Sequence, residues 1–404
     1  MSELFIPQEP RQTDPVFPLW RLGFRPFFLF GALFGIVGVV LWIFFYADWL
    51  PVLPWEPLGG WLGWHRHEMP FGFAVAIVAG FLLTAIQNWT GRPSLRGRPL
   101  MWLFVLWAAA RACWLLGVPW QWTLMPELAF IFLLAFFTGR LLWQVRQSHN
   151  YSAPGTILLM GLADIESLAG VATGNVAWQH NGAMAVIWLI VALMTMIGGR
   201  VIPFFTQRGL GRPQARTTPL RLDMALMIAA LVLSALAAFG SGVGVAPQWP
   251  FAVLFMALAA AHAFRLWRWY DHGIWSVALL WPLHLACLWM AVAFVALAAY
   301  HVGWLSSSSI ALHALTVGAM GGLILAMIAR VSLGHTGRPL QTSKAMTWAF
   351  ALLNLGAVAR VFLTDSFPLS GLLISSLCWL IAFGLFVSLH APILCRPRAD
   401  GSPG

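Results

Sequence analysis

The chain contains very few charged residues. Only 9% of its 404 residues are Asp, Glu, Lys or Arg, whereas 60% are hydrophobic. A soluble globular protein carries roughly 25% charged residues. The chain also lacks the polar linkers that would separate the domains of a soluble protein of this length. These absences exclude a soluble multidomain protein and predict one integral membrane domain over residues 1–404.

Cysteine is scarce as well. Four cysteines lie far apart, and no two form a CxxC pair. This spacing argues against a disulfide framework or a zinc knuckle. The simplest interpretation is that they are buried bystanders.

The apolar blocks lack the alternation of barrel strands. Each spans about 18 to 25 residues, enough to cross ~30 Å of hydrocarbon as a helix. Because only helices and closed barrels satisfy their backbone in lipid, we predict an all-α polytopic membrane protein. Its twelve transmembrane helices are expected at about 24–46, 69–89, 100–118, 124–145, 154–172, 182–205, 219–240, 248–269, 274–300, 308–331, 344–362 and 367–391, between tails at 1–23 and 392–404.

Basic residues give the chain a net charge of +10, but their positions argue against nucleic-acid binding. Nearly all of the 23 occupy the tails, including Arg11, or every second loop. Only Arg66 falls on the opposite side. The positive-inside rule therefore places both termini in the cytoplasm and makes the lipid bilayer the main partner. The N-terminal tail lacks the apolar region of a signal peptide, so we expect it to be retained.

Two segments match without gaps and indicate an internal repeat. His67 to Pro93 reads HEMPFGFAVAIVAGFLLTAIQNWTGRP, and His313 to Pro339 reads HALTVGAMGGLILAMIARVSLGHTGRP. A looser third copy runs from His180 to a GRP at 211–213. The copies fall in predicted helices 2, 6 and 10, so the chain is interpreted as three four-helix pseudo-repeats. Twelve-helix transporters commonly repeat as two sixes.

Two arginines occupy nearly equivalent positions within predicted spans. Arg111 lies in helix 3 and Arg360 in helix 11. An arginine inside the bilayer costs at least ~2.5 kcal/mol on insertion scales, which predicts an anionic partner or a wet cavity. One interpretation is that both converge on one anion; the alternative is an ion pair with Asp164 or Glu166 of helix 5.

Histidines gather at the membrane boundary opposite the predicted cytoplasmic side. This group comprises His65, His67, His180, His301 and His313. A single histidine is usually a hydrogen-bonded core residue, but several at one depth favour a metal site, since imidazole is a common ligand of iron and copper. An apolar bundle also suits haem, which needs two axial donors on facing helices.

The WHRHEM stretch allows two geometries. If Trp64 to Glu68 is extended, His65 and His67 project to the same side. If the helix begins earlier, the two side chains diverge by roughly 200° and cannot bind one metal. Because His67 aligns with His313, we predict these two as the axial haem pair.

The remaining candidates follow from that pair. His65 would be available for a second metal, with His180, His301 or Met69. Arg66, Arg111 and Arg360 would bind the propionates through charge-assisted hydrogen bonds.

Several motifs resemble the NnrS family over nearly the whole chain. They are FRPFF at 24–28, HxHEMPFGF at 65–73, GFLLTAIQNWTG at 80–91, GGRVIPFFT at 198–206 and HALTVGAMGGLILAMIARVSLGHTGRPL at 313–340. The resemblance implies a bacterial inner-membrane protein of twelve helices that contains haem and copper and is linked to denitrification and nitrosative-stress tolerance. It implies no settled catalytic reaction.

A more distant similarity is to the catalytic subunits of haem–copper oxidases and nitric oxide reductases. That family also has twelve helices in three arcs, with haem ligands on helices 2 and 10. The present helix 10 has only His313 and helix 7 has no histidine, so the binuclear centre of that family is not expected.

Two classes of function follow. The first is a haem- and copper-containing protein that binds, senses or turns over nitric oxide, with an unidentified electron donor if it is an oxidoreductase. The second is a secondary transporter, or a metal- or haem-handling membrane protein without redox catalysis.

Overall fold

The computed structural model describes residues 15–51, 53–241 and 247–402, so the predicted tail residue Arg11 lies outside the described part. All regular structure in these ranges is helical. The α-helices are α1 (Phe24–Tyr46), α2 (Gly60–His67), α3 (Val75–Thr90), α4 (Arg98–Leu115), α5 (Trp120–Gln144), α6 (Ser152–Thr173), α7 (Val176–Gly209), α8 (Leu220–Ala238), α9 (Trp249–Trp269), α10 (Trp281–His301), α11 (Ser308–His313), α12 (Gly322–His335), α13 (Lys344–Val358) and α14 (Pro368–Leu394).

Three π-helical segments continue α-helices without a break. They are η2 (Glu68–Ala74), η5 (Ala314–Gly321) and η6 (Ala359–Leu363). Short 3-10 turns occur at η1 (Pro18–Trp20), η3 (Ser148–Asn150) and η4 (His272–Ser276).

The described residues contain eleven helices that are long and apolar enough to cross a membrane. The prediction of an all-helical, multi-pass membrane protein is therefore confirmed. The remaining predicted span corresponds to α4, which has 18 residues and includes Arg98 and Arg111. The second predicted span, 69–89, begins earlier in the structure, at Gly60. The ninth predicted span, 274–300, corresponds to α10, which begins later, at Trp281.

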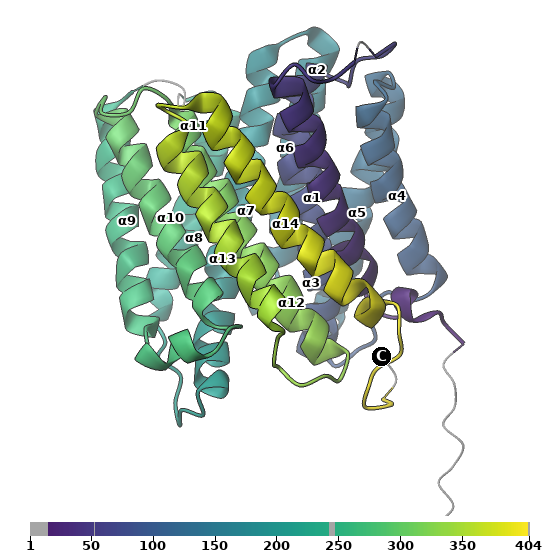
Figure 1. Cartoon of the computed structure of the whole chain (residues 1–404). Coiled ribbons are helices and arrows are strands. Elements are labelled where there is room, and N and C mark those ends of the chain that lie inside the picture. The colour runs from purple at the N-terminus through teal and green to yellow at the C-terminus, as the bar shows by residue number, and fades with distance from the viewer. Residues whose placement is uncertain (1–14, 52, 242–246, 403–404) are drawn as a thin grey trace, which may run out of the picture.

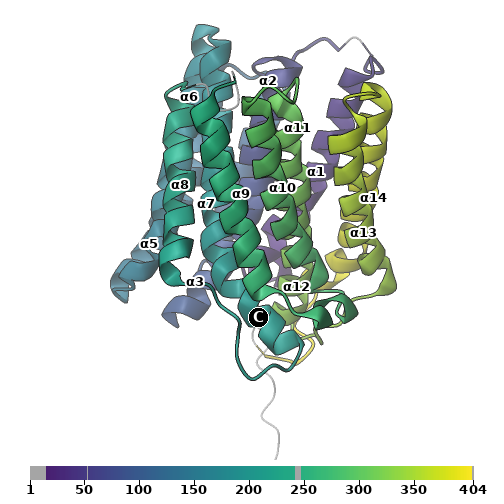
Figure 2. The same cartoon turned by 90° about the vertical axis from the view of Figure 1, so that its left-hand side faces the viewer.

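The three repeat-related helices are more buried than the rest. Within the most apolar 18 residues of each helix, the buried share is 83% for Gly60–Thr90, 83% for Val176–Gly209 and 67% for Ser308–His335. The corresponding share is 28% for α8, which lies at the periphery (Figure 2). The repeat-related helices thus form the interior of the bundle, and the other helices surround them with apolar side chains available to lipid.

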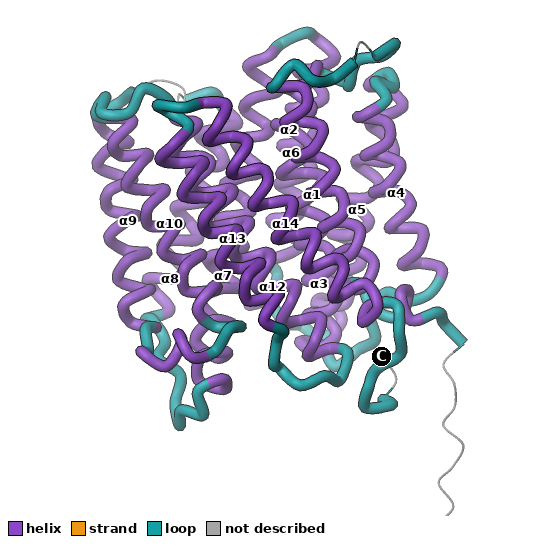
Figure 3. Tube along the Cα trace, viewed as in Figure 1, coloured by secondary structure: helices purple, strands orange, loops and turns teal. Residues whose placement is uncertain are grey.

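The first and last helices pack together and close the bundle. Trp379 of α14 donates a hydrogen bond from Nε1 to the carbonyl oxygen of Gly35 in α1 at 3.1 Å. Short loops join the helices at the two ends (Figure 3).

The start of α1 and the C-terminal end lie at one end of the bundle, while α2 and α11 lie at the other (Figure 1). The start of α1 and the end of α14 thus share one side of the bundle; that this side is cytoplasmic stays a prediction.

Candidate functional site

The two matching repeat segments have the same unusual backbone form. In the first, α2 ends at His67 and is followed directly by the π-helical segment η2 and then α3. In the second, α11 ends at His313 and is followed by η5 and α12. π-Helical turns are rare in proteins overall, and those that occur are frequently found at functional sites. The looser third copy lacks this form, since α7 is a continuous α-helix. The division of the chain into three four-helix repeats stays a prediction.

His65 and His67 point in different directions because the chain is helical here. The extended alternative for Trp64 to Glu68 is wrong, since α2 runs to His67. The His65 ring stacks on Trp42 of α1 with a centroid distance of 4.2 Å, and the His67 ring stacks on Trp114 of α4 at 3.7 Å. The two histidines therefore belong to separate environments.

His67 lies in a buried cluster of acids. Its Nδ1 is 2.9 Å from Glu68 Oε1, and its Nε2 is 2.8 Å from Asp164 Oδ1. Its ring is held between Phe71, at 4.5 Å between centroids, and Trp114. Both ring nitrogens and both ring faces are thus occupied by protein groups.

Arg111 bridges Glu68 to a further carboxylate of this cluster, that of Glu127. Its Nη1 donates to Glu68 Oε1 at 2.6 Å, and its Nη2 pairs with Glu127 of α5. Arg111 is thus ion-paired within the bundle, as the alternative expected, but its direct partners are Glu68 and Glu127 in place of Asp164 or Glu166. Asp164 bonds His67 instead, and Glu166 is half-buried.

The acid cluster can hold a cation. One donor atom each of His67, Glu127 and Asp164 lies within 4.8 Å of the other two. Three buried carboxyl groups face one guanidinium, and the oxygens Glu68 Oε2 and Asp164 Oδ2 have no hydrogen-bond partner. Excess negative charge in an apolar bundle requires protons or a bound cation.

Sequence reasoning missed Glu68 and Glu127. The signal was available, since both acids lie in or beside predicted spans, where a carboxylate is costly.

The second histidine, His313, has a basic environment. Its Nδ1 is 2.7 Å from the carbonyl oxygen of Ser309, which accepts only, so Nδ1 carries the proton and Nε2 is free to accept. Arg360 Nη2 lies 3.3 Å from that Nε2. His65 is within electrostatic range of both His313 and Arg360. The atoms His65 Nδ1 and Arg360 Nε are buried without a hydrogen-bond partner.

The other predicted site residues are dispersed. Arg66 acts electrostatically on His65 and His180, while Arg111 and Arg360 contact different groups and do not converge on one anion. His301 accepts a hydrogen bond from the backbone N–H of Gln248 at 3.1 Å. Met69 packs beside Gly38. No interaction in the described ranges joins His67 to His313, and their pairing stays a prediction.

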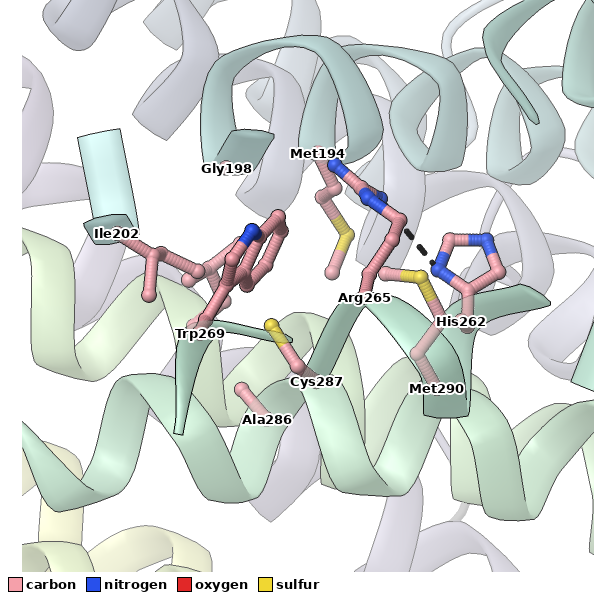
Figure 4. Close-up of a pocket in the computed structure, with 10 residues that line it drawn as sticks. Met194, Gly198, Ile202, His262, Arg265, Trp269, Ala286, Cys287 and Met290 are labelled. Carbon is pink, nitrogen blue, oxygen red and sulfur yellow. Dashed lines mark hydrogen bonds between the residues drawn. The ribbon is translucent and has the colours of Figure 1, made fainter. Parts of the chain in front are cut away.

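A sulfur-lined pocket lies between α7, α9, α10 and α12. His262, Arg265, Cys287 and Met290 line it together with Met194 (Figure 4). Arg265 is fixed by Asp223 at 2.9 Å and approaches His262 Nδ1 at 3.5 Å. Imidazole, thiol and thioether are the donor types that suit Cu(I). Sequence reasoning missed this combination because its members come from three helices.

A comparison with family models gives one match, to the NnrS protein family, over residues 18–398. No curated protein matches the chain. Since the match covers nearly all of the sequence, the chain belongs to the NnrS family.

Proposed function

We propose that this protein of the nitric oxide response holds haem beside His65 and His313 in the bacterial inner membrane, with both termini cytoplasmic. The observation that carries the proposal is the uncompensated basic environment of His313. The hydrogen-bond partners of Arg360 in the described residues are Thr364, Ser309 and His313, none of which is an acid. A ligand that carries both a metal and carboxylates would satisfy these groups.

The donor set fits haem. His313 Nε2 would exchange its contact with Arg360 for the iron, and His65 offers a buried Nδ1 without a partner. Arg360 would bind a propionate, with Arg66 as a second candidate, because guanidinium–carboxylate bonds are strong. The Ser309 carbonyl orients the His313 ring, as outer groups do for metal-binding histidines. Bound haem would supply an iron that takes nitric oxide as a ligand or transfers one electron.

His65 replaces His67 in this proposal because both ring nitrogens of His67 are already hydrogen-bonded. Binding of haem iron by His67 would require loss of its bond to Asp164 or Glu68, whereas His65 Nδ1 has no partner. The predicted His67–His313 pair remains the competing arrangement.

Copper is proposed for the sulfur-lined pocket. Cys287, Met290 and His262 would act as ligands, since soft sulfur donors select Cu(I). The earlier candidates His180, His301 and Met69 share no partner in the described residues. The cluster of His67, Glu127 and Asp164 is the competing copper site.

The test is absorption spectroscopy and metal analysis of the purified protein from haem-replete cells. We expect a Soret band that is lost in His65→Ala and His313→Ala and kept in His67→Ala. The exposed His149 provides the matched control, His149→Ala. Loss of haem in His67→Ala with retention in His65→Ala would restore the original pair, and wild-type protein without haem would remove the proposal.

The location of the copper site is tested in the same preparation. We expect Cys287→Ser to lower the copper content while the Soret band persists. Unchanged copper in Cys287→Ser, with loss in Asp164→Asn, would move the metal to the acid cluster.

A further inference from the structure

Three chain segments meet at the end of the bundle opposite α2 and α11 (Figure 1). They are the start of α1, the turn after α12 and the tail after α14. Arg25 Nη1 donates to the carbonyl oxygens of Leu394 and Arg396, each at 2.8 Å. The backbone N–H of Ala399 donates to the carbonyl oxygen of Thr336 at 2.9 Å. The tail is thus docked onto the TGRP turn of the second repeat copy.

Gly337 in that turn shows how closely the tail docks. Its φ is +69°, and a Cβ there would lie 2.5 Å from Asp400 Cγ. Gly91, the equivalent glycine in the first copy, also has a positive φ, but a Cβ there would meet nothing within 4 Å. Only the second of these two turns therefore carries the tail.

Arg25 is a buried cation with unsatisfied donors. Its residue exposure is 0%, and its Nε and Nη2 have no hydrogen-bond partner. A buried charge without a partner is strongly unfavourable, and each unmade hydrogen bond adds a desolvation penalty. A simple topology anchor would instead extend into water, as the exposed Arg92 does.

Three arginines act electrostatically on Arg25 and oppose its charge. Arg21, Arg338 and Arg398 all lie within its electrostatic range. Asp400 is the acid on the docked tail, and both of its oxygens are bonded by Arg398, at 3.0 and 2.6 Å. Among the described residues, the guanidinium groups of Arg25, Arg338 and Arg398 thus outnumber the one carboxylate beside them, and an anion would offset the excess.

We propose that Arg25, Arg338 and Arg398 form a binding site for a phosphate group. Phosphate oxygens accept charge-assisted bonds from guanidinium groups, and basic pockets between helices at the cytoplasmic side are typical sites for anionic headgroups. The half-buried Arg338 and Arg398 provide the approach, and Arg25 provides unpaired donors beneath the tail. The phosphate comes from an acidic phospholipid or from soluble phosphate.

The experiment measures the melting temperature of the full-length protein in neutral detergent during titration with phosphatidylglycerol, with phosphatidylcholine, and with inorganic phosphate. We expect stabilisation by phosphatidylglycerol or inorganic phosphate but not by phosphatidylcholine. Arg338→Gln should weaken the apparent affinity about tenfold, because one charge-assisted contact is lost. Arg92→Gln is the matched control, since Arg92 occupies the same TGRP position in the first copy and bonds Gln144.

The outcomes separate the sources. Stabilisation by phosphatidylglycerol alone assigns the site to lipid, and stabilisation by inorganic phosphate assigns it to a soluble anion. Equal affinity loss in Arg338→Gln and Arg92→Gln, or no stabilisation by either ligand, would overturn the site. Arg25→Gln is a second variant, whose folding is checked by gel filtration because Arg25 also holds the tail. The readout does not depend on haem, so it is independent of the proposed function.

Discussion

Substitution of Arg111 tests whether the acid cluster is held together by its single guanidinium. Arg111→Gln removes the cation that bonds Glu68 and pairs with Glu127, and it leaves both carboxyl groups buried. Removing one partner of a buried ion pair costs about 3–5 kcal/mol. With an unfolding entropy of roughly 2.1 cal/mol/K per residue, a chain of 404 residues should melt about 4 to 6 °C lower.

The assay is thermal unfolding in detergent, with the haem content recorded in parallel. Glu166→Gln is the matched control, because Glu166 lies on the same helix as Asp164 but is only half-buried. Its melting temperature should stay near that of the wild type.

A double-mutant cycle gives the decisive comparison. Glu127→Gln alone should also destabilise, since it removes a direct partner of Arg111. The double variant should lose less stability than the two single losses added together, because neither charge is then left without its partner. Additive losses, or a melting temperature of Arg111→Gln within 1 °C of wild type, would refute the reasoning.

Two further predictions concern packing and pH. Gly72→Ala and Gly318→Ala should each cost about 1–3 kcal/mol by overpacking, since their Cβ atoms would lie 2.6 Å from Phe34 and 2.5 Å from Trp289. Gly155→Ala, with nothing within 4 Å, should melt no lower than wild type, and equal losses in all three would contradict this. Outside the membrane, hydrogen bonds from Arg212 and the Gly273 N–H lower the pKa of Asp271. A lowered pKa stabilises the fold above the ordinary Asp value of about 4 and loses this effect as pH falls further. The difference in melting temperature between wild type and Asp271→Asn should therefore shrink from pH 6 to pH 3; a constant difference would exclude the ion pair as its cause.

The membrane spans were predictable because apolar length is a local property. The predicted ends of α1 and α9 agree with the structure to within a residue. Helix 2 was predicted to begin late because the first part of the span, GWLGWHRH, mixes tryptophan with polar residues. This error mattered, since the helical start is what separates His65 from His67.

The acid cluster was not predictable in the same way. Its carboxylates come from η2, α5 and α6, and no sequence period relates residues on separate helices. Asp164 was named as an intramembrane acid, but its partner His67 could be identified only from the approach of α6 to α2 in the folded bundle. The sulfur-lined pocket was unpredictable for the same reason, because its His, Cys and Met residues come from three separate helices.

The two repeat copies share a backbone frame but have opposite electrostatics. Each has a histidine before a π-helical segment and an arginine on a later helix that acts on that histidine. In the first copy Glu68 follows His67, whereas Ala314 stands at the equivalent position in the second. Arg111 is therefore surrounded by acids, and the cluster attracts cations. Arg360 has no acid among its hydrogen-bond partners in the described residues, so its surroundings attract an anion. Two matching segments with the same backbone form thus differ in the charge around their histidines, which is why His67 and His313 need not serve the same ligand.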